Sequence, residues 1–291
     1  MGVDCDDAAA LAILLNAQKN GACKIEAITA SSTREGATAT VKVICDYYGE
    51  SIPLGAMALP AIPCDSMNNY SLAVKNKYNE KDITVDAVRL MREKLAQSED
   101  KMMIIAVGPL TNIARLLRSE PDDIVEKSGI ELVKEKVDAC YVMGGSFEQN
   151  KNMYANIHPE WNIVQDIRSA QIVTETMPIP MYFCPFEAGI NVFTVMGKDD
   201  NPVWYCMYKY AENNKHPYED GFLRPSWDPI TVLCAIDDIS EYFDLSQKGF
   251  ICVKENGETI FKEDVKGMHQ VLLLKESYLG VSDIVNAKIP R

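Results

Sequence analysis

The sequence lacks any concentrated basic segment. Its 29 lysines and arginines are outnumbered by 42 aspartates and glutamates, which gives a formal net charge of −13. The densest basic stretch, residues 127–136, mixes both signs of charge, as a solvated helix face does. Because a polyanion would meet a repulsive field at such a surface, we predict no nucleic-acid partner.

Other features that the sequence lacks exclude further classes of protein. The nine cysteines form no Cys-x-x-Cys pair, and some lie inside apolar runs, as Cys45 and Cys234 do. Such cysteines are typical of buried small hydrophobes in a reducing compartment, so we predict a cytoplasmic location. No run of about 18 apolar residues is present, and no membrane partner is predicted. A Gly-x-Gly-x-x-Gly turn is also missing, which argues against a dinucleotide-binding Rossmann protein.

What the sequence does contain is alternation of short apolar runs with amphipathic stretches. The runs at residues 25–29, 52–55, 102–107, 139–143 and 179–184 predict strands. The stretches at residues 8–18, 37–48, 84–97, 111–117 and 167–176 predict helices. Residues 250–274 alternate around Asn256-Gly257, a dipeptide typical of hairpin turns. We predict one α/β domain over residues 1–291, with a single open, mainly parallel sheet flanked by helices and a C-terminal antiparallel hairpin.

The beginning of the sequence is unusual in its density of acids. Asp4, Asp6 and Asp7 stand within four positions, directly before an alanine-rich helical stretch. Helix capping would explain one of them, since a carboxylate at a helix start accepts backbone N–H groups. Three carboxylates so close together repel one another unless a cation or protons offset their charge.

Four segments, taken in order, resemble the inosine-uridine preferring nucleoside hydrolase family. The first is the acidic start, Gly2-Val-Asp-Cys-Asp-Asp-Ala. The others are Val107-Gly-Pro-Leu-Thr-Asn, then Met143-Gly-Gly followed by Glu160-Trp-Asn, and finally Trp227-Asp-Pro-Ile-Thr. Each can be explained separately as a helix start or a tight turn. Their joint order over residues 2 to about 236 carries the resemblance.

The resemblance implies a calcium ion, a ribonucleoside substrate and hydrolysis of its N-glycosidic bond. The implied metal ligands are the carboxylates of Asp7 and Asp228 and the carbonyl of Val107. The implied catalytic residues are Asp6, which would bind the ribose 2′-hydroxyl, and Asp4. The implied substrate-binding residues are Asn156, Glu160, Asn162 and Trp227. A hard cation with oxygen ligands suits this chemistry, because it holds a water and two vicinal hydroxyls together. The family also suggests a homodimer or homotetramer.

Two departures from the family pattern bear on activity. The family begins with a strand ending in Asp-x-Asp, whose second aspartate is the usual base, and here Met1 stands where that segment should be. We therefore expect that the first strand lies upstream of Met1, in an extension that would also have room for a signal peptide. Asp4 is a partial substitute for the base. The second departure is Trp227, which replaces a histidine that protonates the leaving base; Trp cannot donate that proton but can stack on a base or fill its pocket. His158 is a candidate donor, or simply an exposed loop residue.

Two functions remain open. The first is an active nucleoside hydrolase. The second is a catalytically impaired or repurposed family member that binds a ribosyl ligand or a partner without turnover. The upstream sequence distinguishes them, because a strand ending in Asp-x-Asp would restore the missing carboxylate.

Overall fold

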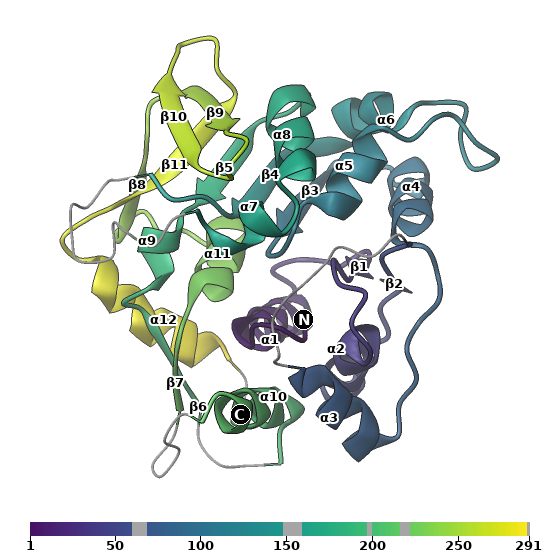
Figure 1. Ribbon diagram of the computed structural model, residues 1–291, viewed down its shortest axis with the longest axis vertical. Helices are drawn as coiled ribbons and strands as arrows, with labels where there is room; N and C mark the ends of the chain where they lie inside the picture. The colour runs from purple at the N-terminus through teal and green to yellow at the C-terminus, as the bar shows by residue number, and fades with distance from the viewer. Residues whose placement is uncertain (60–68, 148–158, 197–199, 216–221, 290–291) are drawn as a thin grey trace.

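The computed structural model describes residues 1–59, 69–147, 159–196, 200–215 and 222–289 (Figure 1). Its strands are β1 (Ile28–Thr29), β2 (Leu54–Gly55), β3 (Met102–Ala106), β4 (Val137–Met143), β5 (Met181–Cys184), β6 (Phe193–Met196), β7 (Phe222–Pro225), β8 (Phe243–Leu245), β9 (Gly249–Val253), β10 (Thr259–Glu263) and β11 (His269–Leu274). Its helices are α1 (Asp6–Lys19), α2 (Ala37–Tyr47), α3 (Tyr70–Tyr78), α4 (Ala87–Gln97), α5 (Thr111–Leu117), α6 (Gly129–Lys136), α7 (Trp161–Gln165), α8 (Ile167–Thr176), α9 (Phe186–Gly189), α10 (Pro202–Asn213), α11 (Trp227–Ile236), the 3-10 turn η1 (Tyr278–Gly280) and α12 (Val281–Lys288).

The main sheet has seven strands. Six follow the order β10-β9-β11-β5-β4-β3, and β8 pairs with β11. The β3–β4, β4–β5 and β5–β11 pairs are parallel, whereas β8 and β9 each run antiparallel to β11. Strands β9 and β10 form an antiparallel hairpin around Gly257, whose φ of 86° suits glycine. The predicted α/β fold with a C-terminal antiparallel hairpin is confirmed.

Two hydrophobic cores cover the two faces of this sheet. On one face α5, α6 and α8 pack over β4 and β5, around Leu116, Val142 and Phe183. On the other face α11 lies against the sheet, and α1 packs behind it around Ala12, Ile13 and Ile230. Figure 1 shows α1 and α11 on the opposite side of β3 and β4 from α5 and α8. This arrangement brings the starts of α1 and α11 to the same end of the sheet.

The structure differs from the predicted elements at several boundaries. The runs at residues 25–29 and 52–55 form only the two-residue strands β1 and β2, which pair with each other in a separate parallel sheet. The predicted single sheet is therefore interrupted between β1 and β3. Helix α4 begins at Ala87 rather than at residue 84, because Asp86 caps it by accepting the Arg89 N–H at 2.8 Å. Helix α10 was not predicted, although the sequence indicates its start: Asn201 is the N-cap, and a proline occupies the first helical position.

The cysteines lie mostly where the sequence predicts them. Among the described cysteines, Cys5, Cys45, Cys140, Cys184 and Cys206 are buried, Cys23 and Cys234 are half-buried, and Cys252 is exposed and departs from the pattern. No helix in the described ranges has the length and apolar character needed to cross a membrane.

His269 gives a test of this packing. It is 3% exposed, and its Nδ1 accepts the Ile251 N–H at 2.9 Å. Burial lowers the pKa of His269 to about 4 from the usual 6.5. Between these values the unfolded chain binds a proton that the folded protein does not, so its stability falls as the pH is lowered from 6.5 toward 4, by about 3 kcal/mol in total.

We predict that His269→Asn, which keeps an acceptor but does not titrate, flattens this part of the pH profile. The measurement is the free energy of urea unfolding at several pH values between 4 and 7. An unchanged slope in the variant would show that His269 is not the group responsible.

Candidate active site

The site is built from the first turns of two helices. Asp6 and Asp7 lie in the first turn of α1, and Asp228 lies in the first turn of α11. Carboxylates are favoured there because the unpaired N–H groups of a helix start carry partial positive charge. One carboxylate also joins the helices directly: Asp6 Oδ2 accepts the backbone N–H of Asp228 at 3.1 Å. Residues 222 positions apart are thereby held together.

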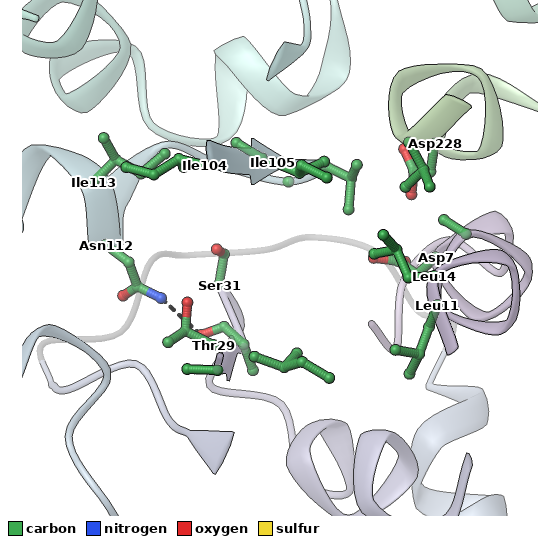
Figure 2. Close-up of a pocket in the computed structure, with 18 of the residues that line it drawn as sticks. Asp7, Leu11, Leu14, Thr29, Ser31, Ile104, Ile105, Asn112, Ile113 and Asp228 are labelled. Atoms are coloured by element: carbon green, nitrogen blue, oxygen red, sulfur yellow. Dashed lines mark hydrogen bonds between the residues drawn. The ribbon is translucent and has the colours of Figure 1, made fainter. Parts of the chain in front are cut away.

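The acids share one pocket with most of the other predicted residues. The described residues that line it include Asp4, Asp6, Asp7, Val107, Glu160, Asn162, Trp227 and Asp228. Figure 2 shows the side chains of Asp7 and Asp228 in the same part of this pocket, beside Leu11 and Leu14 of α1. Asn156 and His158 lie outside the described residues. The predicted convergence therefore extends to every predicted residue that the structure describes.

Burial and mutual repulsion shape the acidity of these groups. Asp6 and Asp228 are 1% and 4% exposed. Burial, and then the charge of the neighbouring aspartates, raises the pKa of both well above the usual value. Burial also raises the pKa of Asp7, although the Met1 ammonium opposes this effect. Such carboxylates gain stability from a cation or from protons.

Two cations already lie among the acids. The Met1 ammonium is 2.9 Å from Asp7 Oδ1. Arg224, on β7, forms an ion pair with Asp4 and places its Nε 3.6 Å from Asp6 Oδ1. Four carboxylates against these two cations leave an excess of two negative charges when all the acids are ionised. Sequence reasoning missed Arg224, whose only signal is its position three residues before Trp227.

Arg224 makes Asp4 a poor candidate for a general base. Burial raises the pKa of Asp4, but the Arg224 guanidinium and hydrogen bonds outweigh it, so that the pKa lies below its usual value. The Asp4 carboxylate also accepts the backbone N–H of Cys5 at 2.7 Å. A carboxylate held in its charged form in this way takes up a proton weakly.

The Trp227 ring packs against two neighbours. It stacks on Phe186, with ring centroids 5.3 Å apart, and the Arg224 guanidinium carbon lies 5.0 Å from the Trp227 ring centroid. The indole N–H donates to the Phe186 carbonyl at 2.8 Å. These contacts favour Trp227 as a fixed wall of the pocket over a platform on which a base stacks.

Glu160 and Asn162 are held by the start of α7. Glu160 is 5% exposed and accepts the backbone N–H groups of Gly145, Asn162 and Ile163 at 2.8–3.2 Å. Burial raises the pKa of Glu160 to about 7, although these hydrogen bonds oppose it. The Asn162 side chain donates to the Met143 carbonyl at 3.3 Å. The Met143-Gly-Gly turn and the Glu160 segment, matched separately in the sequence, are thus joined by hydrogen bonds.

The oxygen atoms that line this part of the pocket are of the kind that bind a hard divalent cation. Carboxylates and a carbonyl are the ligands that calcium takes, and the excess of two negative charges matches one such ion. In the described part of the chain, however, no three His, Cys, Asp or Glu side chains are grouped as a complete metal site. Asp6 is engaged by the α11 backbone and Arg224, and Asp7 by the Met1 ammonium.

The family of the chain follows from comparison with known proteins. The inosine-uridine preferring nucleoside hydrolase family matches residues 1–278. The chain belongs to this family. The predicted resemblance is confirmed, and with it the prediction of a hydrolase of the glycosidase class.

Relatives within and around the nucleoside hydrolase family are distant. A protein of Schizosaccharomyces pombe is 23% identical over 80% of this chain and 73% of its own. The pyrimidine-specific ribonucleoside hydrolase RihA of a Shewanella species is 30% identical over 51% of this chain. That alignment spans 45% of the Shewanella protein, less than half its length.

Solved structures share the fold at low identity. The inosine-uridine preferring nucleoside hydrolase of Bacillus anthracis aligns over 99% of this chain and 97% of its own, with a TM-score of 0.66 and 18% identity. The type III effector XopQ, solved with adenosine diphosphate ribose, covers 100% of this chain and 91% of its own, with a TM-score of 0.66 and 16% identity.

Arg224 is the residue whose removal should disturb the site most. We predict that Arg224→Gln lowers the free energy of unfolding by about 3 kcal/mol, because it leaves the buried carboxylates of Asp4 and Asp6 without their cation. The matched control is Arg89→Gln, whose partner Asp123 is exposed and whose loss should lower the free energy of unfolding much less. Equal losses in urea unfolding of the two variants would contradict this account.

Proposed function

We propose that this protein hydrolyses the N-glycosidic bond of ribonucleosides, releasing the free base and ribose, in a reaction that depends on calcium. The observation that carries the proposal is the convergence of Asp6, Asp7 and Asp228 from two helix starts in one pocket. Membership of the nucleoside hydrolase family supports the type of reaction. The pocket offers acids for the ribose.

The proposed calcium ligands are the carboxylates of Asp7 and Asp228 and the carbonyl of Val107, all from residues that line the pocket. When bound, the cation supplies the positive charge that holds a water and the ribose hydroxyls in place. The excess negative charge of the acids supports this assignment. The two organic cations limit it, since the Met1 ammonium occupies Asp7.

The roles of the remaining residues follow from their burial and hydrogen bonds. Asp6, whose pKa is raised by burial, takes up a proton more readily than an ordinary aspartate and would also bind the 2′-hydroxyl. Glu160, Asn162 and, as predicted from the sequence, Asn156 would hold the ribose hydroxyls. Asp4 orients Arg224 in this proposal rather than acting as the base.

The reaction itself is one displacement at the anomeric carbon. The water oxygen forms a bond to C1′ as the C1′–N bond breaks, and the electron pair of that bond leaves with the base nitrogen. One proton of the water passes to the Asp6 carboxylate, and the departing base takes up a proton from solvent. The centre is oxocarbenium-like at the transition state, so the surrounding carboxylates stabilise its positive charge. Trp227 gives no proton to the leaving base, which favours substrates whose base leaves readily.

Binding of a ribosyl ligand without turnover is the second candidate. The poor basicity of Asp4 favours it. The complex of XopQ with adenosine diphosphate ribose supports a ribosyl ligand in this fold. The two functions differ in one observable, the release of base from bound nucleoside.

Asp228→Asn tests the proposed function. We predict that it lowers base release from inosine or uridine on the order of 100-fold or more, because the metal and the transition state lose a carboxylate. It should leave the free energy of unfolding unchanged or higher, since a buried carboxylate repelled by its neighbours is replaced by a neutral isostere.

The measurements are reducing-sugar release with and without added calcium, and urea unfolding. The control is Asp138→Asn, whose side chain is 63% exposed on β4. Base release that is indifferent to calcium and to Asp228→Asn would overturn the proposal. Nucleoside binding with no release at any calcium concentration would favour the binding function.

A further inference from the structure

The proposed reaction leaves one requirement unassigned, the stabilisation of the departing base. As the C1′–N bond breaks, its electron pair passes to the base nitrogen, so negative charge develops on the base. The Trp227 indole is poorly suited to offset this charge, because its N–H already donates to the Phe186 carbonyl at 2.8 Å. No histidine is among the described residues that line the pocket. A cation that donates hydrogen bonds to the base would meet the requirement.

Four basic side chains line the pocket in the described part of the chain, and one of them lies at its acidic end. The acids lie where the parallel strands of the sheet finish, because α11 begins beside the residues just after β5. Lys24 and Lys101 precede β1 and β3, and Lys94 lies in the last turn of α4, before β3. Arg34 instead follows β1 and is half-buried. It is therefore the basic side chain best placed to act beside the acids.

The loop after β1 reaches the segments that carry the site. A Cβ on Gly108, which follows β3, would lie 3.6 Å from the Cβ of Ser31, which follows β1. Further along the loop, the Arg34 Cδ atom lies 3.6 Å from the position of a Cβ on Gly2. Gly2 stands two residues before Asp4. The Arg34 side chain thus lies against the chain segment that leads into the acids.

The backbone on both sides of Arg34 is held by hydrogen bonds. Before it, the Ala30 carbonyl accepts the Asn112 side-chain N–H at 2.9 Å. After it, the Glu35 carbonyl accepts the Ser71 hydroxyl at 3.0 Å. Electrostatic stabilisation of a transition state is effective when the donor is already in position before the reaction. A guanidinium on a segment fixed in this way meets that condition.

A guanidinium also suits a phosphate, but the helix start beside Arg34 is already occupied by a carboxylate. Helix α2 begins at Ala37, and Asp82 accepts the backbone N–H groups of Gly36 and Ala39 at 2.9 and 3.2 Å. A phosphate bound at a helix start would use the same N–H groups. The departing base is therefore the better partner for Arg34.

We propose that Arg34 is a catalytic residue that stabilises the departing base by donating charge-assisted hydrogen bonds to its oxygen or nitrogen acceptors. The inference rests on the proposed function, because it needs cleavage of the glycosidic bond. The guanidinium keeps its proton, and the base leaves as an anion that takes up a proton from solvent afterwards. A guanidinium has five N–H donors, so it can serve a base together with other partners.

This role defines the class of base that the site favours. The negative charge on a departing base spreads onto an acceptor next to the glycosidic nitrogen, as it does onto O2 of uracil. A guanidinium can donate to such an acceptor with its planar fork of N–H groups. We therefore expect substrates whose base carries an acceptor in this position, with uridine as the test case.

The first test compares two leaving groups on the same sugar. p-Nitrophenolate leaves without help, whereas uracil needs stabilisation. We expect Arg34→Met to lower kcat/KM for uracil release from uridine on the order of 100-fold, and that for p-nitrophenol release from p-nitrophenyl ribofuranoside less than about 3-fold. Retained p-nitrophenol release also shows that the variant is folded. The matched control is Lys101→Met, which removes an exposed cation before β3 and should leave both rates unchanged.

The outcomes separate this inference from the proposed function. Equal losses with both substrates, or no loss with either, overturn the role of Arg34. A preference of the unaltered protein for uridine 5′-monophosphate over uridine that Arg34→Met abolishes would assign Arg34 to a phosphate and also overturn it. Release of neither uracil nor p-nitrophenol by the unaltered protein would instead contradict the proposed hydrolysis itself.

The second test keeps the charge and removes the fork. Arg34→Lys retains a cation but has a compact ammonium in place of the planar guanidinium. We expect it to lower uracil release roughly tenfold, less than Arg34→Met does, with p-nitrophenol release again little changed. A loss of uracil release as large as that of Arg34→Met would show that the positive charge is not what assists the base, and would overturn the proposal.

Discussion

The contact between Asp6 and the first turn of α11 is the constraint on which the site depends. A single buried carboxylate caps α11 through the Asp228 N–H and lies beside Arg224, so it fixes the two helix starts relative to each other. It also forces like charges together, since Asp4 and Asp7 flank it in the sequence and Asp228 lies across from it. Burial, and then this repulsion, raises the pKa of Asp6 and of Asp228. Such a cluster of mutually repelling carboxylates is typical of functional sites rather than of structural ion pairs.

The organic cations at the site have a double effect. Arg224 stabilises the fold by offsetting Asp4 and Asp6, and it covers one face of Trp227. The Met1 ammonium does the same for Asp7, but at a position where the proposed cation would bind. The proposed cation and the ammonium would therefore compete for one carboxylate.

Much of the fold could be predicted from the sequence because its signals are local. Apolar runs such as Met102 to Ala106, the Asn256-Gly257 turn and the alanine-rich stretch after Asp7 each specify an element without reference to the rest of the chain. The convergence of Asp7 and Asp228 is not local, and only the ordered set of motifs pointed to it. Which strands pair with each other was harder to predict. Strands β1 and β2 are short because a strand with a neighbour on one edge only is weakly stabilised at its ends, and no local sequence pattern indicates this.

The sequence could not predict the role of a residue where that role depends on residues that are distant in the chain but adjacent in space. Nothing near Asp4 in the chain reveals that an arginine 220 residues away lowers its pKa. Likewise the sequence suggests Trp227 as a stacking surface for a base, and only the structure shows that Phe186 and Arg224 already pack against its ring. The most direct measurement of the central claim is a crystal structure with calcium and a nonhydrolysable ribosyl ligand. The account predicts an ion with Asp7, Asp228 and Val107 oxygens at about 2.3–2.6 Å. An ion bound elsewhere, or Asp7 still paired with the Met1 ammonium and no ion beside it, would contradict it.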